Sequence, residues 1–290
     1  MDYANDNLQV HVGDCLESLR VMPSHSVNCC VTSPPYYWQR DYGVDGQLGH
    51  EDTPELFVEA LVSVFREVRR VLRDDGTLWL NLGDSYYNGN GQPKGSDPRS
   101  PSRNWMRKKV RPLDSAGLGY PKKSLLGMPW RTALAMQSDG WTLRQEIIWC
   151  RETAFPEPSV KDRPHRQHET VFLFSKSRWY DFDRGALAEE SVWHVQHERA
   201  AKGHSAPFPA ELVRRCILAG CPDGGTVLDP FGGSGTTAGV ALAHGRSAVL
   251  CELNPDYAKL VPARIAAILK NHKHNSPGND NNPAAREAIA

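Results

Sequence analysis

The stretch that decides the fold is Val227-Leu228-Asp229-Pro230-Phe231-Gly232-Gly233-Ser234-Gly235-Thr236-Thr237. An apolar run ends at Asp229, glycines then let the backbone turn tightly, and a helix is predicted over residues 237–243. A ligand can approach the main chain at such a turn, because small residues leave room and a helix begins with free N–H groups. The stretch therefore predicts an α/β fold with a ligand site at a strand-to-helix turn.

The residue that closes the next strand supports a cofactor at this turn. Glu252 follows the apolar residues 248–251, and an acidic residue about 20 positions after a glycine turn commonly binds ribose hydroxyls. The chain has no GxGxxG or GxxxxGK pattern, which argues against a dinucleotide or a nucleoside triphosphate. A purely structural turn is the alternative, but the strand, turn, helix and acidic residue in this order favour a cofactor that carries a ribose.

A second motif, Thr32-Ser33-Pro34-Pro35-Tyr36, follows the apolar residues 27–31, which are predicted to form a buried strand. The two prolines fix the backbone and remove two N–H donors, so the carbonyl of Pro34 is held as an acceptor. The Ser33 hydroxyl offers a second acceptor, provided that its own proton is directed elsewhere. Tyr36 offers a flat face on which a base can stack. This combination suits an amino group on a flat ring, and an ordinary loop is the alternative.

Strands and helices alternate along the rest of the chain. Further strands are predicted at residues 9–14, 77–82, 146–150, 170–174, 226–228 and 247–250, with a turn at residues 75–76. Further helices are predicted at residues 15–22, 56–72, 129–138, 209–219 and from 254 to about 270. This alternation indicates a mostly parallel, doubly wound sheet.

Composition narrows the class of protein. The chain has 290 residues, enough for one large domain or one domain with an insertion, and its 34 basic and 34 acidic residues cancel. No signal peptide and no run of ~20 apolar residues is evident, so a cytoplasmic protein without membrane contact is expected. The seven cysteines lack CxxC spacing and are expected to be free thiols, and no metal site is expected from the histidine pairs.

A basic segment, residues 88–124, interrupts the alternation. Its nine basic and two acidic residues give a net charge of +7. Trp105 lies among these charges, and cations beside an aromatic ring are typical of a nucleic-acid contact. The predicted DNA contacts are Arg103, Arg107, Lys108, Lys109, Arg111, Lys122 and Lys123, helped by Arg151, Lys161, Arg163 and Arg166 from a second basic stretch. A solvated loop without a partner is the alternative.

Together the two motifs resemble those of the β-class amino-DNA methyltransferases, an S-adenosyl-L-methionine-dependent family that modifies cytosine N4 or adenine N6. In this class the catalytic motif precedes the cofactor motif, as it does here. The resemblance implies a permuted Rossmann-like methyltransferase sheet, mostly parallel with one antiparallel strand, with helices on both faces and the two motif strands side by side. This single domain would span residues 1–270, and residues 271–290 are expected to form a disordered tail.

The resemblance also implies which residues bind S-adenosyl-L-methionine. The turn from Asp229 to Thr237 would cradle the methionine part, Glu252 would hold the ribose, and Gly13-Asp14 would meet the adenine ring. The expected cofactor-binding residues are Asp14, Phe208, Asp229, Phe231, Gly233, Ser234, Gly235, Thr236 and Glu252. Phe208 lies in a segment that would touch the methionine carboxylate. The alternatives are a core position for Phe208 and a helix cap for Asp14.

The expected catalytic residues are Ser33, Pro34, Pro35 and Tyr36. An exocyclic amine is a poor nucleophile because its lone pair is conjugated with the ring, and two acceptors would pull it toward tetrahedral geometry. The methyl group would then transfer in line without a covalent enzyme intermediate, and the chain lacks the Pro-Cys dipeptide of ring-carbon methyltransferases. In a duplex the base must first leave the stack.

Several alternatives stay open. Ser33 before the prolines and the pair Phe208-Pro209 are similar to the cytosine-N4 group, so cytosine is slightly favoured over adenine. An RNA or protein-amide methyltransferase and a non-catalytic DNA-binding regulator are the competing functions. Amide-modifying enzymes typically have Asn before the prolines and the cofactor motif first, unlike this chain. Double-stranded DNA is the expected partner, a homodimer the expected assembly, and a cognate restriction endonuclease a further candidate partner.

Overall fold

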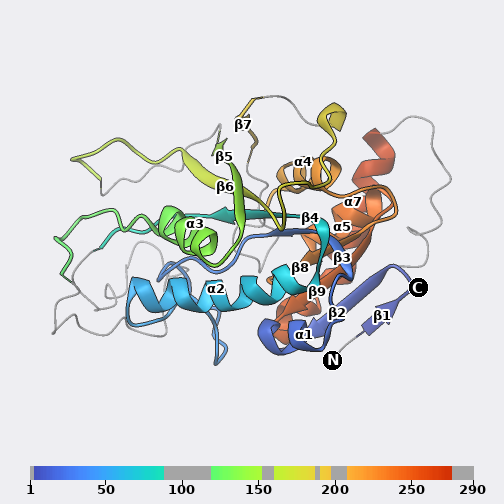
Figure 1. Cartoon of the computed structure of the whole chain (residues 1–290), viewed down its shortest axis with the longest axis horizontal. Coiled ribbons are helices and arrows are strands. Elements are labelled where there is room, and N and C mark those ends of the chain that lie inside the picture. Colours follow the sequence, from blue (N-terminus) through green and yellow to red (C-terminus); the bar gives the residue numbers. More distant parts are fainter. Residues whose placement is uncertain (1–2, 88–118, 152–159, 187–189, 197–207, 276–290) are drawn as a thin grey trace, which may run out of the picture.

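The computed structural model describes residues 3–87, 119–151, 160–186, 190–196 and 208–275. Within these ranges nine strands form one sheet, in the order β1-β2-β9-β8-β3-β4-β6-β5-β7. In that order the strands span Tyr3–Asn5, Leu8–Val12, Ser247–Glu252, Thr226–Asp229, Val27–Thr32, Leu72–Leu82, His168–Ser175, Thr142–Cys150 and Val192–His194. Figure 1 shows this sheet as the middle layer of the molecule.

The sheet is mostly parallel, as predicted. Neighbouring strands from β2 to β4 all run parallel, whereas β6 runs antiparallel to both β4 and β5. β6 is thus the one reversed strand of the prediction, and β1, antiparallel to β2, is a second reversed strand at the sheet edge. The prediction lacks β1 and β7, because strands of three residues are too short to show a period.

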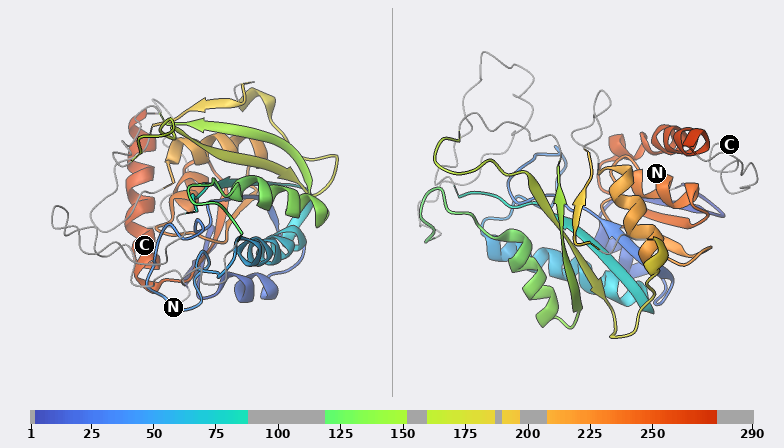
Figure 2. Two further views of the ribbon diagram at one scale, coloured as in Figure 1. Left: turned by 90° about the vertical axis from the view of Figure 1, so that its left-hand side faces the viewer. Right: turned by 90° about the horizontal axis from the view of Figure 1, so that it is seen from above.

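Helices cover both faces of the sheet (Figure 1, Figure 2). The helices α1 (Cys15–Val21), α2 (Pro54–Val71) and α3 (Met128–Ser138) share one buried apolar cluster with the sheet. The helices α4 (Ala210–Gly220), α5 (Thr236–Ala243) and α7 (Val261–Asn275) share another. In β4, Leu78 and Leu80 join the first cluster and Trp79 the second, because side chains alternate along a strand. Burial of both faces explains why the central strands are apolar without alternation.

The two motif strands, β3 and β8, lie side by side as predicted. Cys29 pairs with Val227 and Cys30 with Leu228 in parallel register. The carboxyl ends of parallel strands meet at one edge of a sheet, so the segments that follow β3 and β8 start from the same edge. This pairing brings together two motifs that lie far apart in the sequence.

Two boundaries differ from the prediction. β4 begins at Leu72, and the expected turn at residues 75–76 lies inside an irregular part of the strand, where Val27 pairs with Leu72 but Cys29 pairs with Thr77. The expected C-terminal helix is split into α6 (Pro255–Ala258) and α7, and α7 continues to Asn275. Five residues of the predicted tail are therefore helical, and residues 276–290 lie outside the described ranges.

The cysteines are free thiols, as the cysteine spacing predicts. All seven cysteines are free, and only Cys15 and Cys150 are less than fully buried. Among the helices that the structure describes, none combines the length and the apolar character needed to cross a membrane.

Candidate active site

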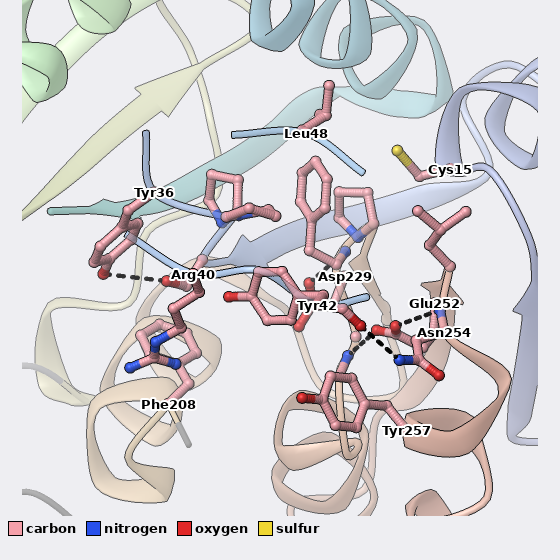
Figure 3. A pocket seen from close by; sticks show the side chains of 18 of the residues that line it. Cys15, Tyr36, Arg40, Tyr42, Leu48, Phe208, Asp229, Glu252, Asn254 and Tyr257 are labelled. Atoms are coloured by element: carbon pink, nitrogen blue, oxygen red, sulfur yellow. Dashed lines mark hydrogen bonds between the residues drawn. The ribbon is translucent and has the colours of Figure 1, made fainter. Parts of the chain in front are cut away.

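A pocket of about 330 Å³ lies at the edge of the sheet where the parallel strands end (Figure 3). It is lined by residues that follow or close β2, β3, β8 and β9, and by the loop after β3. Figure 3 shows Tyr36, Arg40 and Phe208 at one end of the pocket, with Glu252 and Asn254 at the other. The pocket is therefore long. One end has an arginine and two aromatic rings, and the other end has a carboxylate and an amide.

Both predicted residue sets meet in this pocket. Ser33, Pro34, Pro35 and Tyr36 line it, together with Asp14, Phe208, Asp229, Phe231, Gly233, Ser234, Thr236 and Glu252. Gly235 is not among the lining residues. It precedes α5 with a φ of 90°, and a Cβ there would lie 2.8 Å from Val261 Cγ1. Gly235 thus lets α7 pack closely against the start of α5.

The Asp229 carboxylate ties three parts of the site together. Thr32 Oγ1 donates to Asp229 Oδ1 at 2.6 Å, and Thr237 Oγ1 donates to Oδ2 at 2.7 Å. The backbone N–H of Phe231 also donates to Oδ1, at 3.0 Å. Burial raises the pKa of Asp229, and these hydrogen bonds oppose the rise. The carboxylate therefore joins the end of β3, the glycine turn and the first residues of α5.

The Glu252 carboxylate holds the glycine turn from the next strand. Its Oε2 accepts the backbone N–H of Gly233 at 2.7 Å, and its Oε1 accepts that of Asn254 at 2.8 Å. Burial raises the pKa of Glu252, whereas these two N–H donors lower it. Each carboxylate oxygen can accept a further hydrogen bond, so Glu252 can serve a ligand while it holds the turn.

The two residues with open alternatives satisfy both interpretations. Asp14 lines the pocket and also caps α1, where its Oδ1 accepts the N–H of Glu17 at 3.0 Å. Phe208 lines the pocket and also packs against the apolar cluster of α4 and α5.

A polar network that was not predicted surrounds the second motif. The Tyr36 hydroxyl donates to Glu169 Oε2 at 2.6 Å and lies 2.9 Å from Asn81 Oδ1. Ser33 Oγ lies 3.2 Å from Asn81 Oδ1 and 3.3 Å from the Tyr36 hydroxyl. Arg151 Nη1 lies 3.5 Å from Glu169 Oε1. Asn81, Arg151 and Glu169 also line the pocket.

One signal for this network is present in the sequence. Asn81 interrupts the apolar run of residues 78–82, and a polar residue inside a buried strand needs a partner. Glu169 stands one residue before the predicted strand 170–174, and its position depends on strand pairing. Because Asn81 pairs with Val171 in the antiparallel register of β4 and β6, Glu169 reaches the same edge as Ser33. The sequence does not reveal that register.

The loop after the second motif forms another wall. Arg40, Tyr42, Gln47 and Leu48 line the pocket from this loop. The loop is fastened to the opposite wall, because Asn254 Nδ2 donates to the Tyr42 carbonyl at 3.2 Å. Gln47 Oε1 accepts the N–H of Tyr42 at 2.9 Å, which holds the loop in shape. An irregular loop carries no periodic signal, so the prediction did not include these residues.

The basic segment is attached next to the pocket. Tyr86 and Leu125 form a bridge, and Tyr87 N donates to Ser124 O at 2.8 Å, so the two ends of the segment are joined. The first end follows β4, whose carboxyl end lies at the pocket edge. Of the predicted DNA contacts, Arg103, Arg107, Lys108, Lys109 and Arg111 lie outside the described residues.

Two of the predicted DNA contacts that the structure describes have partners within the protein. Lys123 forms an ion pair with Asp162, and the Arg163 guanidinium lies 3.9 Å from the centre of the Tyr86 ring. Lys122 and Lys123 are exposed and Arg163 is half-buried, so a phosphate can reach the two lysines directly.

Arg166 is tied more firmly. Its Nη1 donates to the Asp84 carbonyl at 3.1 Å, and its Nη2 lies 3.6 Å from Asp84 Oδ2. The same carboxylate accepts the N–H groups of Gly127 and Met128 at the start of α3. Arg166 therefore supports the fold beside the start of α3.

Comparison with known proteins identifies the family. Residues 27–262 match the N6/N4 methyltransferase family, which is described as DNA methylase. The chain belongs to this DNA methylase family. It is 46% identical over 263 residues to the Type II methyltransferase M.Cfr9I of Citrobacter freundii. This alignment covers 87% of this chain and 86% of that protein. It is 44% identical to the Type II methyltransferase M.SmaI of Serratia marcescens, in an alignment that covers 89% of this chain and 90% of that protein.

Solved structures share the fold of this DNA methylase. The PvuII cytosine-N4-specific DNA methyltransferase matches with a TM-score of 0.68 at 22% identity, over 99% of this chain and 93% of that one. A putative DNA modification methylase from Thermus thermophilus, solved with S-adenosyl-L-methionine, matches with a TM-score of 0.64 at 27% identity, over 90% and 93%. The predicted methyltransferase sheet and the predicted family are confirmed.

Proposed function

We propose that this DNA methylase moves the methyl group of S-adenosyl-L-methionine to the exocyclic amino group of a flipped base in duplex DNA. The observation that carries the proposal is the shared pocket of the two motifs at the ends of β3 and β8. An amino group held by Ser33 and Pro34 would then lie close to a cofactor held by the glycine turn. No covalent intermediate is needed, because the amine itself is the nucleophile.

The residues of the pocket fit S-adenosyl-L-methionine. The glycine turn offers main-chain atoms to the methionine part, and the Glu252 carboxylate suits ribose hydroxyls. Asp14 lines the pocket after β2, the strand beside β9, and would meet the adenine end. The cofactor would supply a methyl group bound to a positively charged sulfur. Cys15, which also lines the pocket, does not compete as a nucleophile, since burial raises the pKa of its thiol to about 12.

The chain's own residues would prepare the amino group. Ser33 Oγ and the Pro34 carbonyl accept its two N–H bonds, which frees the nitrogen lone pair from the ring. Hydrogen bonds to Asn81 and Glu169 hold the Tyr36 ring in one orientation. Stacking on Tyr36 and contacts of basic residues with the DNA backbone would offset the cost of unstacking, which is a few kcal/mol.

We favour cytosine N4 as the target over adenine N6, because a hydroxyl precedes the prolines at Ser33. The curated relatives are Type II methyltransferases, and we propose that this chain likewise marks a short duplex sequence against a cognate restriction endonuclease. A two-fold dimer is the expected assembly.

The decisive experiment identifies the modified nucleoside. Duplex DNA of mixed sequence is incubated with the protein and S-adenosyl-L-methionine, digested to nucleosides and examined by mass spectrometry. We expect N4-methyldeoxycytidine, and a matched RNA duplex should stay unmodified. Detection of N6-methyldeoxyadenosine instead would show that adenine is the target base. A wild-type protein that modifies neither base would contradict the proposal.

The basic segment should supply phosphate contacts. Replacing Arg107, Lys108 and Lys109 with alanine should weaken DNA binding and reduce the slope of log affinity against log salt by about three units, one for each lost contact. The affinity for S-adenosyl-L-methionine should not change. The measurement is a salt titration of DNA binding by fluorescence anisotropy.

A charge-matched control uses Lys259, Lys270 and Lys273, which are exposed on the segment from α6 to α7. The triple alanine variant of these lysines should keep the wild-type slope. Superimposable slopes for wild type and the Arg107, Lys108 and Lys109 variant would show that the basic segment is a solvated loop.

A further inference from the structure

The Ser33 hydroxyl can serve as an acceptor only if its own proton has a destination. The structure provides one, because Ser33 Oγ lies 3.3 Å from the Tyr36 hydroxyl and 3.2 Å from Asn81 Oδ1. The Tyr36 hydroxyl in turn donates to Glu169 Oε2 at 2.6 Å. A continuous chain of hydrogen bonds thus leads from the predicted position of the amino group to a carboxylate.

The end of this chain is built to hold a negative charge. Arg151 Nη1 lies 3.5 Å from Glu169 Oε1, and both side chains are mostly buried, with exposed fractions of 15% and 14%. Arg151 is itself held in place, because its Nη2 donates to the Arg166 carbonyl at 2.8 Å. The chain of hydrogen bonds therefore ends at a carboxylate with a guanidinium beside it, and a carboxylate oxygen can take up a proton.

Tyr36 and Asn81, the two groups between Ser33 and Glu169, stay neutral. Burial, followed by the nearby Glu169 carboxylate, raises the pKa of Tyr36 well above its usual value, so the phenol keeps a proton to donate. Asn81 is an amide, and its oxygen accepts hydrogen bonds without taking up a proton. A proton that enters this network at Ser33 is accordingly passed on to Glu169.

The ring of Tyr36 has a fixed seat in this arrangement. A Cβ at Gly83 would lie 2.3 Å from a ring carbon of Tyr36, so the ring rests directly on the backbone that follows β4. This seat and the hydroxyl contacts leave the ring little freedom. The distances of the chain are therefore set by the fold.

We propose that Glu169 is the final acceptor of the proton that the methylated amino group releases, and that Ser33 and Tyr36 relay it. The inference rests on the proposed function. The amino nitrogen gains a methyl group and loses one proton, which bonds to Ser33 Oγ. Ser33 passes its own proton to the Tyr36 oxygen, and Tyr36 passes its proton to Glu169 Oε2. Solvent removes the proton from Glu169 after the product leaves.

Glu169 acts through Tyr36, so its test needs readouts beyond a lower rate. The Glu169→Gln variant keeps an oxygen that accepts the Tyr36 hydrogen bond but cannot take up a proton. Its single-turnover rate of methyl transfer near pH 7 should fall by about 10²-fold, in the range of general acid–base catalysis. The rate should then rise with pH, because solvent must accept the proton, whereas the wild-type rate stays flat between pH 6.5 and 8.

Rescue and a second variant separate the relay from a structural role. Formate should restore part of the rate of the Glu169→Ala variant and none of that of the Tyr36→Phe variant, which breaks the relay before Glu169. Glu146→Gln is the matched control and should keep wild-type rates. Glu146 lies on the neighbouring strand β5, and its Oε1 accepts a hydrogen bond from Trp130 Nε1 at 3.0 Å, outside the pocket lining.

A readout without ligands completes the test. The infrared difference between ligand-free wild type and Glu169→Gln at pH 7.5 should show an ionised carboxylate, and a protonated carboxyl there would overturn the relay. A flat, wild-type rate in Glu169→Gln would overturn it as well. If wild type itself fails to methylate DNA, the proposed function is wrong, which is a distinguishable outcome.

Discussion

Replacing Ser33 with alanine should lower the rate of methyl transfer by about 10²–10³-fold, the usual cost of losing one preorganised polar group at a reacting centre. Ser33 stands at the end of β3, at the edge of the sheet where the pocket lies. Alanine leaves the amino group with only the Pro34 carbonyl as acceptor, so the nitrogen lone pair stays conjugated with the ring. Single-turnover methylation of duplex DNA measures the effect.

The affinity for S-adenosyl-L-methionine should stay at the wild-type value in this variant, because the glycine turn and Glu252 are untouched. Ser26→Ala is the matched control at the other end of the same strand, where Ser26 Oγ donates to the Pro23 carbonyl at 2.7 Å. Ser26→Ala should keep the wild-type rate. Near-normal turnover in Ser33→Ala would show that the reacting amine is held elsewhere.

The fold follows from the sequence where segments are long and apolar. The runs that became β3, β8 and β9 are continuous because helices bury both faces of the sheet. The edge strands β1 and β7 have three residues each, and no pattern distinguishes such segments from loops. α6 lies against β2 and β9 and α7 lies against α5, and sequence periodicity does not contain these contacts.

The pocket could be predicted where its residues lie inside motifs. Ser33 and Tyr36 follow β3, Glu252 closes β9, and parallel strands bring such ends to one edge. Asn81 and Glu169 belong to the same edge through the antiparallel pairing of β4 and β6. That register is a tertiary property, so these residues entered the site only with the structure.

Charge patterns were less informative than motifs. Arg151 and Arg166 belong to a basic stretch that composition assigns to DNA. In the structure Arg151 pairs with Glu169 inside the pocket, and Arg166 bonds to Asp84 beside the start of α3. Counting cations predicts a long-range attraction for phosphate, but it does not separate a DNA contact from a buried ion pair.

Replacing Gly233 with valine should abolish measurable binding of S-adenosyl-L-methionine, a loss of at least about 10²-fold in affinity, or ~2.7 kcal/mol. Gly233 lines the pocket with a φ of 53°, a left-handed conformation that a β-branched residue rarely adopts. Its N–H donates to Glu252 Oε2 at 2.7 Å, so a shift of this backbone also releases the carboxylate expected to hold the ribose. Isothermal titration calorimetry measures the affinity.

Backbone strain alone must be separated from the loss of the cofactor cradle, and Gly245 provides the matched control. Gly245 has a φ of 72°, follows α5 outside the pocket lining, and has open space around an added Cβ. Gly245→Val should lower the thermal midpoint by a similar amount to Gly233→Val but keep wild-type affinity, because only Gly233 lies at the proposed methionine end. Equal affinities in the two variants would mean that the turn from Asp229 to Thr237 is structural and that the cofactor binds elsewhere.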